Sequence, residues 1–222
     1  AVGRDAERLA GTVDLIVAAG GAARVATCDV SDPAAVTVLA AAVADEEISI
    51  LVNNAGVAGP VAALTEIAPD DWDAVFAVNV RGVYLMCRAF LPAMVARGAG
   101  DVLNIASVSG KRPLAARTPY CASKAAVIAL TATLAGEVGP HGVTVNTLSP
   151  GPVHGERMHR NFTLEARRTQ TSYARAEAAF VGRAALGRLV HEHEVALAAA
   201  AMLHMPGLTG ADLDLSAGMV AR

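Results

Sequence analysis

Hydrophobic and polar positions along this chain alternate between short apolar runs and longer stretches with helical spacing. The short runs end at turn residues and predict strands at 24–28, 48–53, 101–106, 143–148 and 212–215. The stretches between them predict helices over 5–19, 32–44, 69–97, 118–138 and 191–204. This alternation is typical of βαβ units, which build parallel sheets.

Two of the predicted strands are apolar on both faces. The runs at 50–52 and 102–106 show no alternation of polar and apolar positions, as expected of parallel strands covered by helices above and below. The pattern therefore predicts an α/β fold with a doubly wound, Rossmann-like parallel sheet. We expect a single domain over residues 1–222.

The expected centre of such a sheet is missing from the pattern. A doubly wound sheet normally begins with a central strand and a glycine-rich turn that leads into the first helix. Here residues 1–4 resemble the end of a second strand, and no G-x-G-x-x-G motif occurs in the 222 residues. The strand at 48–53 would then keep an unpaired edge inside the sheet, which is costly. We therefore expect the working protein to carry a further amino-terminal segment.

Composition narrows the classes of function. The chain has 18 basic and 21 acidic residues, so nucleic acid binding through a basic surface is not expected. The longest uninterrupted apolar run, 195–203, is nine residues, against about 20 for a bilayer span, so no membrane span is expected. Cys28, Cys87 and Cys121 lack metal-site spacing. They predict free thiols, a cytoplasmic location and no metal site.

Three residues carry the strongest candidate chemistry: Ser107, Tyr120 and Lys124. Tyr120 and Lys124 stand four residues apart in a predicted helix, so both side chains project from one face. An ammonium near a phenol favours the ionised phenol, which suits a general acid or base. Ser107 closes a predicted strand, where its hydroxyl can bond a substrate oxygen. The alternative is a surface tyrosine and lysine on an amphipathic helix.

The surrounding motifs favour the catalytic interpretation. The segment Tyr-Cys-Ala-Ser-Lys at 120–124 resembles the active-site signature of the short-chain dehydrogenase/reductases, and Ser107 lies 13 residues upstream, as is typical of that family. Residues 53–56, Asn-Asn-Ala-Gly, resemble the family's N-N-A-G motif. Asn79 resembles its helix asparagine, and 146–151 its post-strand element. The sequence is identified as a member of this family, similar to its 3-oxoacyl-reductase-like members.

The resemblance implies a role for each matched residue. Tyr120 exchanges a proton with the alcohol or carbonyl oxygen, Ser107 positions that oxygen, and Lys124 holds the nicotinamide ribose. Asn79 supports a water that connects Lys124 to solvent, and Asn54 ties strands together. The residues implied to bind the cofactor are Arg4, Asp29, Val30, Asn53, Ala55, Gly56, Tyr120, Lys124, Pro150, Gly151 and Val153. These roles imply an oxidoreductase that transfers a hydride between a nicotinamide cofactor and a ketone or secondary alcohol.

The choice of cofactor depends on the end of the second strand. Relatives that prefer NAD usually carry an acid there, which accepts a hydrogen bond from the ribose 2′-hydroxyl and repels a 2′-phosphate. Gly3 occupies that position and Arg4 follows, so a guanidinium is available for the phosphate. NADP(H) is therefore favoured over NAD(H).

The substrate is weakly encoded. The segment 152–183 corresponds to the family's variable substrate lid, and Lys111, Arg112 and Arg117 lie near the expected mouth of the site. The lid itself carries Arg157, Arg160, Arg167, Arg168, Arg175 and Arg183. An acidic or phosphorylated small-molecule substrate and a solvated lid with ordinary surface arginines are both compatible with this pattern.

Two helices predict self-association. The stretches 69–97 and 118–138 carry more apolar residues than one sheet face needs, such as Val83, Met86, Phe90, Ile128 and Leu134. Family members commonly pair these helices across a dyad, so we expect a homo-oligomer, a tetramer or dimer. The alternative is that these residues form ordinary intramolecular core.

A second functional class stays open. A catalytically silent protein of this fold would sense nucleotide or serve as a scaffold. Its support is the missing glycine-rich turn, because pyrophosphate binds backbone N–H groups at a helix amino terminus. The presence of Asn79, Ser107, Tyr120 and Lys124 favours the enzyme.

Overall fold

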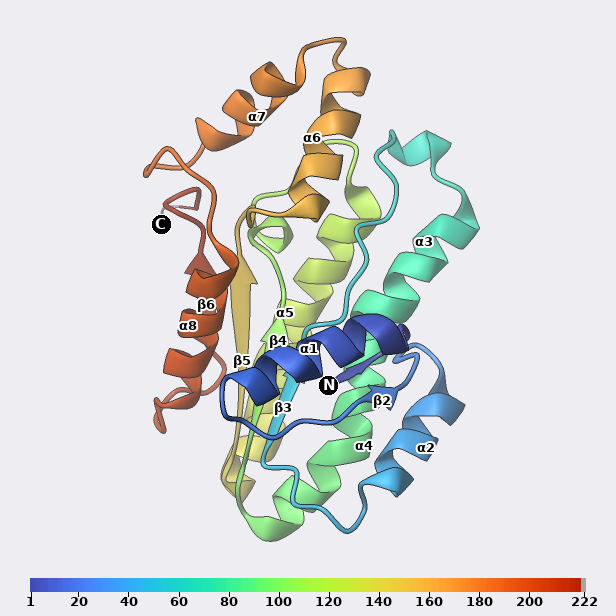
Figure 1. Ribbon diagram of the computed structural model, residues 1–222, viewed down its shortest axis with the longest axis vertical. Helices are drawn as coiled ribbons and strands as arrows, with labels where there is room; N and C mark the ends of the chain where they lie inside the picture. Colours follow the sequence, from blue (N-terminus) through green and yellow to red (C-terminus); the bar gives the residue numbers. More distant parts are fainter. Residues whose placement is uncertain (221–222) are drawn as a thin grey trace.

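Parallel strands alternate with helices through residues 1–220, the part of the expected 1–222 domain that the computed structural model describes (Figure 1). Every strand pair in this part of the chain is parallel, which confirms the α/β class. The strands are β1 (Val2–Gly3), β2 (Ala26–Thr27), β3 (Ile50–Asn53), β4 (Gly100–Ile105), β5 (Val143–Pro150) and β6 (Asp212–Leu215). Strand β2 is shorter than the predicted 24–28, and β5 extends past the predicted 143–148.

The helices follow the predicted pattern, with two more within residues 152–183. They are α1 (Ala6–Ala18), α2 (Pro33–Ala42), α3 (Pro69–Phe76), α4 (Gly82–Arg97), α5 (Thr118–Val138), α6 (Glu156–Arg168), α7 (Tyr173–Val181) and α8 (Glu192–Leu203). The Asp5 and Asp32 carboxylates accept hydrogen bonds from the first backbone N–H groups of α1 and α2. These caps satisfy donors that have no partner within the helix.

The helix predicted over 69–97 is interrupted. A π-helical turn, η2 (Ala77–Arg81), separates α3 from α4 and contains Asn79, which is 1% exposed. The Asn79 side chain bonds the backbone of Val57 and the hydroxyl of Ser123. Single π turns of this kind occur often at functional sites. The apolar pattern of 69–97 does not reveal the interruption, because it continues through the turn.

Helices cover both faces of the sheet. Strands β3, β4, β5 and β6 lie in that order, with α2, α4 and α5 packing on one face, where Val102, Val127 and Val145 are buried. On the other face, α8 packs through Met202 against Leu103 and Leu148 (Figure 1). Adjacent residues of β4 thus enter different cores, as expected for a strand covered on both sides.

The sheet is broken between β1 and β3. Strands β1 and β2 form a separate two-stranded sheet, and β3 is the edge of the four-stranded one. At this break Val2, Ile50 and Val52 are 42%, 46% and 48% exposed, and α1 contributes no buried residue. The break lies where the sequence pattern predicts a central strand.

Two helical stretches, 69–97 and 118–141, are long and apolar enough to cross a membrane by length and composition alone. Both pack against the sheet and contribute core residues, among them Met94 and Val127, each fully buried. We therefore describe them as core helices. The cysteines Cys28, Cys87 and Cys121 are buried and free.

Candidate active site

A cavity of about 730 Å³ is lined by residues at the carboxyl ends of β4 and β5 and by residues of α6 and α7. Figure 1 shows these two helices beyond that end of the strands. In doubly wound sheets, ligands bind outside this edge of the strands. Of the predicted site residues, those that line the cavity are Gly56, Ser107, Tyr120, Lys124, Pro150, Gly151 and Val153. The fold thus brings together residues that are far apart in the sequence.

Tyr120 and Lys124 share one face of the first turns of α5. The Lys124 Nζ lies 6.0 Å from the centre of the Tyr120 ring and donates a 2.7 Å hydrogen bond to the carbonyl oxygen of Ile105. Burial, and to a smaller extent the nearby Arg157 guanidinium, together lower the pKa of Lys124 to about 8. The Tyr120 hydroxyl forms no hydrogen bond within residues 1–220. It is therefore free to meet a ligand oxygen in the cavity.

Ser107 is held at the end of β4 by the turn that follows it. Its Oγ accepts a hydrogen bond from the backbone N–H of Ser109 at 3.1 Å and donates a long one, 3.4 Å, to the Pro150 carbonyl oxygen. Gly110 lets this turn lie directly on α5, because a Cβ there would stand 2.8 Å from the Ala125 backbone nitrogen. The close approach sets Ser107 against the helix that carries Tyr120. Nothing in the sequence pattern singles out Gly110.

Asn79 ties the loop after β3 to α5. Its Oδ1 accepts from the Val57 N–H at 2.8 Å, and its Nδ2 donates to the Val57 carbonyl oxygen at 2.9 Å and to Ser123 Oγ at 3.0 Å. Both amide hydrogens are therefore used. A water bridge from Asn79 to Lys124, as the family resemblance implies, would therefore donate to an Asn79 oxygen, either the second lone pair of Oδ1 or the backbone carbonyl.

The loop after β3 leaves open space beside the lysine. A Cβ on Gly56 would lie 3.3 Å from Asn79 Oδ1 and 3.5 Å from Lys124 Nζ. A Cβ at this position would approach Asn79 Oδ1 tightly and would contact the ammonium. Glycine thus keeps room there for a ligand.

The positions of Asn53 and Asn54 contradict the roles expected for them. Asn53 is buried and its Nδ2 donates to Asn104 Oδ1 at 2.8 Å, while Asn104 in turn donates to Thr131 Oγ1 at 2.9 Å. Asn53, and not Asn54, therefore ties β3 to β4. Asn54 lines the cavity instead, whereas Ala55 does not. The reason is the period of two along a strand, which sends Leu51 and Asn53 to the buried face.

Arg4, Asp29 and Val30 lie together at the ends of β1 and β2 and do not line the cavity. The Arg4 Nη1 lies 3.8 Å from Asp29 Oδ2, and the Arg4 side chain is 68% exposed. Hydrogen bonds from the Ser31 hydroxyl and N–H hold the pKa of the Asp29 carboxyl below its usual range. These residues form a second cluster beside the two-stranded sheet, in which Arg4 is exposed and Asp29 and Val30 are partly buried.

The cations expected near the mouth of the site fall into three groups. The cavity is lined by Arg112, Arg117, Arg157 and Arg183. Lys111 is not available to a ligand, because its Nζ pairs with Asp212 at 2.6 Å and also with Asp214. The remaining arginines of residues 152–183 are exposed and lie outside the cavity lining: Arg160, Arg167, Arg168 and Arg175.

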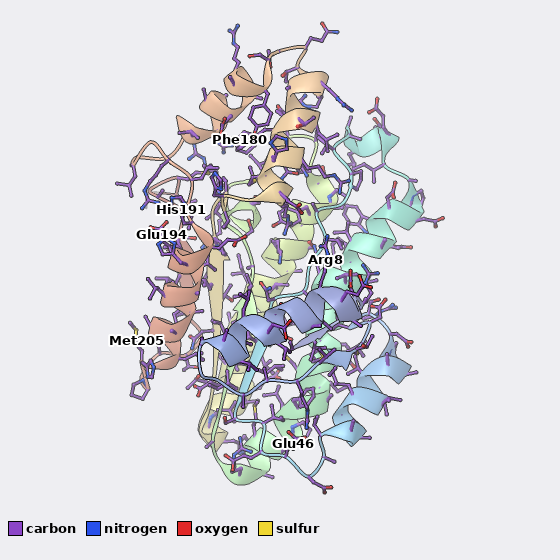
Figure 2. All side chains as sticks on the ribbon, in the orientation of Figure 1. Arg8, Glu46, Phe180, His191, Glu194 and Met205 are labelled. Carbon is purple, nitrogen blue, oxygen red and sulfur yellow. The ribbon has the colours of Figure 1, made fainter. Side chains whose placement is uncertain are left out.

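Nothing in the sequence pattern indicates that two apolar residues, Phe180 and Met219, line the cavity. Phe180 of α7, labelled in Figure 2, lines the cavity, and its ring centre lies 5.4 Å from that of Phe162 of α6. Met219, after β6, reaches the same cavity and packs against Val108. Their distance along the chain from the catalytic motif hides their place in the site. Within residues 1–220 there is no group of three or more metal-ligating side chains.

Comparisons with known proteins match this geometry. A family model described as short chain dehydrogenase matches residues 1–166. The D-threitol dehydrogenase of Mycolicibacterium smegmatis is 44% identical over 142 residues, which are 63% of this chain and 54% of that protein. The chain thus spans about half the length of this relative.

Two solved structures share nearly the whole arrangement. NAD+-bound xylitol dehydrogenase superposes with a TM-score of 0.92 at 27% identity, over 96% of this chain and 86% of that one. An actinorhodin polyketide ketoreductase with NADPH superposes with a TM-score of 0.93 at 32% identity, over 98% of this chain and 85% of that one. With the family model covering most of its length and the motif residues gathered around one cavity, this chain belongs to the short-chain dehydrogenase family.

Proposed function

We propose that the protein is an oxidoreductase that interconverts a ketone and a secondary alcohol with a nicotinamide cofactor, preferentially NADP(H). The observation that carries this proposal is the Tyr120 hydroxyl, which has no partner in residues 1–220 and stands beside the buried Lys124 in a cavity that Ser107 also lines. The names of the similar structures, one with NAD+ and one with NADPH, support the cofactor class.

The residues at Lys124 fit a nicotinamide ribose. An ammonium has three N–H donors, and within the described residues Lys124 uses one of them, on Ile105. The open space at Gly56 borders the same ammonium. Lys124 would therefore donate to ribose hydroxyls, while Pro150, Gly151 and Val153 would flank the nicotinamide.

The chain's own residues perform the proton chemistry. A bound nicotinamide supplies or accepts the hydride at the substrate carbon. In the reductive direction Tyr120 gives its hydroxyl proton to the carbonyl oxygen, and in the oxidative direction its phenolate takes the proton of the alcohol. The Lys124 ammonium stabilises that phenolate. Ser107 turns its long bond away from Pro150 and donates to the substrate oxygen.

Oxidation of NADPH in the presence of a panel of ketones tests this function directly. We expect turnover that depends on both substrates and reverses with a secondary alcohol and NADP+. Tight dinucleotide binding without turnover of any carbonyl or alcohol would instead support a silent nucleotide sensor or scaffold.

We assign the preference for NADP(H) to Arg4, at the end of β1. An exposed guanidinium at this position can bind a 2′-phosphate with charge-assisted hydrogen bonds. Arg4→Ala should raise the KM for NADPH by roughly 10-fold and leave that for NADH near its original value. Steady-state kinetics with each cofactor measure the ratio.

The matched control for Arg4 is Arg24→Ala. Arg24 pairs with Glu46 just before β2 begins, away from the carboxyl ends of β1 and β2. It should leave the ratio of the two KM values unchanged. An equal loss of affinity for both cofactors in Arg4→Ala would contradict a role in phosphate recognition.

Most of the apolar residues expected to mediate self-association belong to the intramolecular core. Val83 and Met86 are buried in the intramolecular core, and Phe90 and Ile128 pack against that core, so these four cannot be counted as spare apolar surface. Leu134 also packs against the core but keeps part of its surface exposed. Between α4 and α5, however, lies a groove of about 460 Å³. We define this α4/α5 groove by Tyr84, Cys87, Arg88, Leu91, Ala129, Leu130, Thr133, Leu134 and Glu137.

A second copy of the chain suits the α4/α5 groove. Arg88 and Glu137 give it opposite charges, which a two-fold axis can bring together in an isologous pair. Ala129→Glu should shift the protein towards monomer, because a carboxylate buried in the interface has no partner. Sedimentation velocity at micromolar concentration measures the shift.

Ala132→Glu is the control for the α4/α5 groove. Ala132 is an exposed alanine on the same helix and does not line the groove. It should sediment like the parent protein. A monomeric parent protein, or an Ala129→Glu variant that sediments as the parent does, would contradict the proposed interface.

We propose residues 152–183 as the substrate lid. Helices α6 and α7 have a small core of their own, in which Phe162 is 1% exposed and contacts Tyr173 and Phe180. This core holds the two helices together as one unit beside the cavity.

The buried, unpaired Cys28, Cys87 and Cys121 support a cytoplasmic location.

A further inference from the structure

Four guanidinium groups face the cavity with little compensating charge. Arg112, Arg117, Arg157 and Arg183 line it, and within residues 1–220 none of them forms an ion pair. The acidic residues in the lining are Glu156 and Glu192, both exposed. The cavity also contains the Lys124 ammonium. Positive charge therefore dominates a site that has to hold a small molecule.

Two of these arginines converge from separate parts of the chain. Arg112 follows the turn at Val108, whose carbonyl oxygen accepts its N–H at 2.7 Å, and Arg183 precedes Ala184 at the end of the lid. Val108, Ala184 and Met219 pack together in one buried cluster, which brings the two arginines to the same corner of the cavity. Burial and the charge of Arg112 hold the pKa of Arg183 below its usual range. The two like charges thus lie close enough to repel each other.

The other two arginines have contacts in other parts of the cavity wall. Arg117 donates from Nη2 to Asn161 Oδ1 at 2.8 Å and is 9% exposed. The Arg157 guanidinium lies 5.2 Å from the centre of the Tyr120 ring. Arg112 uses Nη1 on the Met219 carbonyl oxygen, and Arg183 lies 5.8 Å from the Phe180 ring centre. Both keep further N–H groups for a ligand, since a guanidinium has five.

We propose that the substrate carries an anionic group, carboxylate or phosphate, that binds between Arg112 and Arg183 while its carbonyl or hydroxyl oxygen meets Tyr120. This inference rests on the proposed oxidoreductase function and specifies its substrate class. An anion between two guanidiniums removes their repulsion and forms charge-assisted hydrogen bonds to both. The apolar Phe180 and Met219 beside it reduce competition by water.

Matched pairs of substrates test the charge requirement. Levulinate is compared with methyl levulinate, and dihydroxyacetone phosphate with dihydroxyacetone, in a form of the protein that turns over the nicotinamide cofactor. We expect kcat/KM to favour the anionic member of at least one pair by roughly 10- to 100-fold. The pair with the larger preference distinguishes a carboxylate from a phosphate substrate.

Variants connect the preference to these residues. Arg112→Gln and Arg183→Gln should each reduce the ratio of kcat/KM between anionic and neutral substrate by roughly 10-fold, mainly through KM, and Arg183→Lys should restore part of it. Arg175→Gln changes an exposed lid arginine outside the cavity lining and should leave the ratio unchanged. Melting temperatures identify any variant that fails to fold.

The results distinguish failure of the anion site from failure of the proposed oxidoreductase function. Equal use of charged and neutral substrates, or ratios that the Arg112 and Arg183 variants do not alter, would overturn the anion site and leave the oxidoreductase intact. Absence of turnover with every substrate would overturn the oxidoreductase. Calorimetric binding of levulinate and dihydroxyacetone phosphate then decides: loss of binding in Arg183→Gln supports the site, and no binding to the parent protein overturns it.

Discussion

Replacing Tyr120 with phenylalanine should lower kcat by on the order of 10² or more, because the change removes the proposed proton donor and little else. The hydroxyl has no hydrogen-bond partner within residues 1–220, so its loss costs the fold no bond. The ring, with Lys124 and Arg157 beside it, stays in place. Steady-state kinetics in a form of the protein that binds the dinucleotide measure the loss, and the melting temperature should stay the same.

Tyr84→Phe is the matched control for this substitution. Tyr84 lies on α4, is 49% exposed, and is outside the cavity lining. Its loss of a hydroxyl should leave kcat near that of the parent protein. If Tyr120→Phe kept turnover within a few-fold of the parent protein, the proton would have to come from another group, and the assignment of Tyr120 would be wrong.

Local patterns were enough to predict most of the fold. The strand at 212–215 and the helix start at Asp32–Pro33 are determined by residues close together in the sequence. Both occur in the structure as predicted. The common face of Tyr120 and Lys124 follows from helical geometry alone, and the structure places both side chains at one cavity.

Features that depend on a single residue of register could not be predicted. Asn53 and Asn54 are chemically identical and adjacent, and only the pleat of β3 decides that the first is buried against Asn104 while the second faces the cavity. The π turn at Asn79 is a similar case. One extra residue in a turn changes no apolar pattern, but it places an amide in contact with Val57 and Ser123.

Ion pairs between residues far apart in the sequence could not be predicted either. Lys111 and Arg112 are neighbours with the same charge, but Lys111 is neutralised by Asp212 and Asp214, about a hundred residues away. Arg112 instead faces the cavity with Arg183. Only the tertiary fold distinguishes a structural cation from one that is available to a ligand, and the proposed anion site depends on that distinction.

The break in the sheet between β1 and β3 should weaken both folding and dinucleotide binding. A polypeptide of these 222 residues alone should bind nicotinamide dinucleotide weakly or not at all. Between β1 and β3 several backbone groups lack strand partners, each worth about 1–3 kcal/mol where it is buried, against a total stability of roughly 5–15 kcal/mol for a domain. The half-exposed Ile50 and Val52 show that apolar surface is uncovered at the same place.

Adding a strand, a glycine-rich turn and a helix before Ala1 should recover both stability and binding. We propose that the strand fills the break in parallel with β1 and β3, and that the backbone N–H groups at the start of the helix bind the pyrophosphate. Fluorescence titration with NADPH, run on the two forms together with their thermal unfolding, measures the difference. An added segment of equal length with its strand residues replaced by alternating lysine and glycine should recover neither property. Tight NADPH binding by the 222 residues alone would show that the break between β1 and β3 is not a vacant strand position.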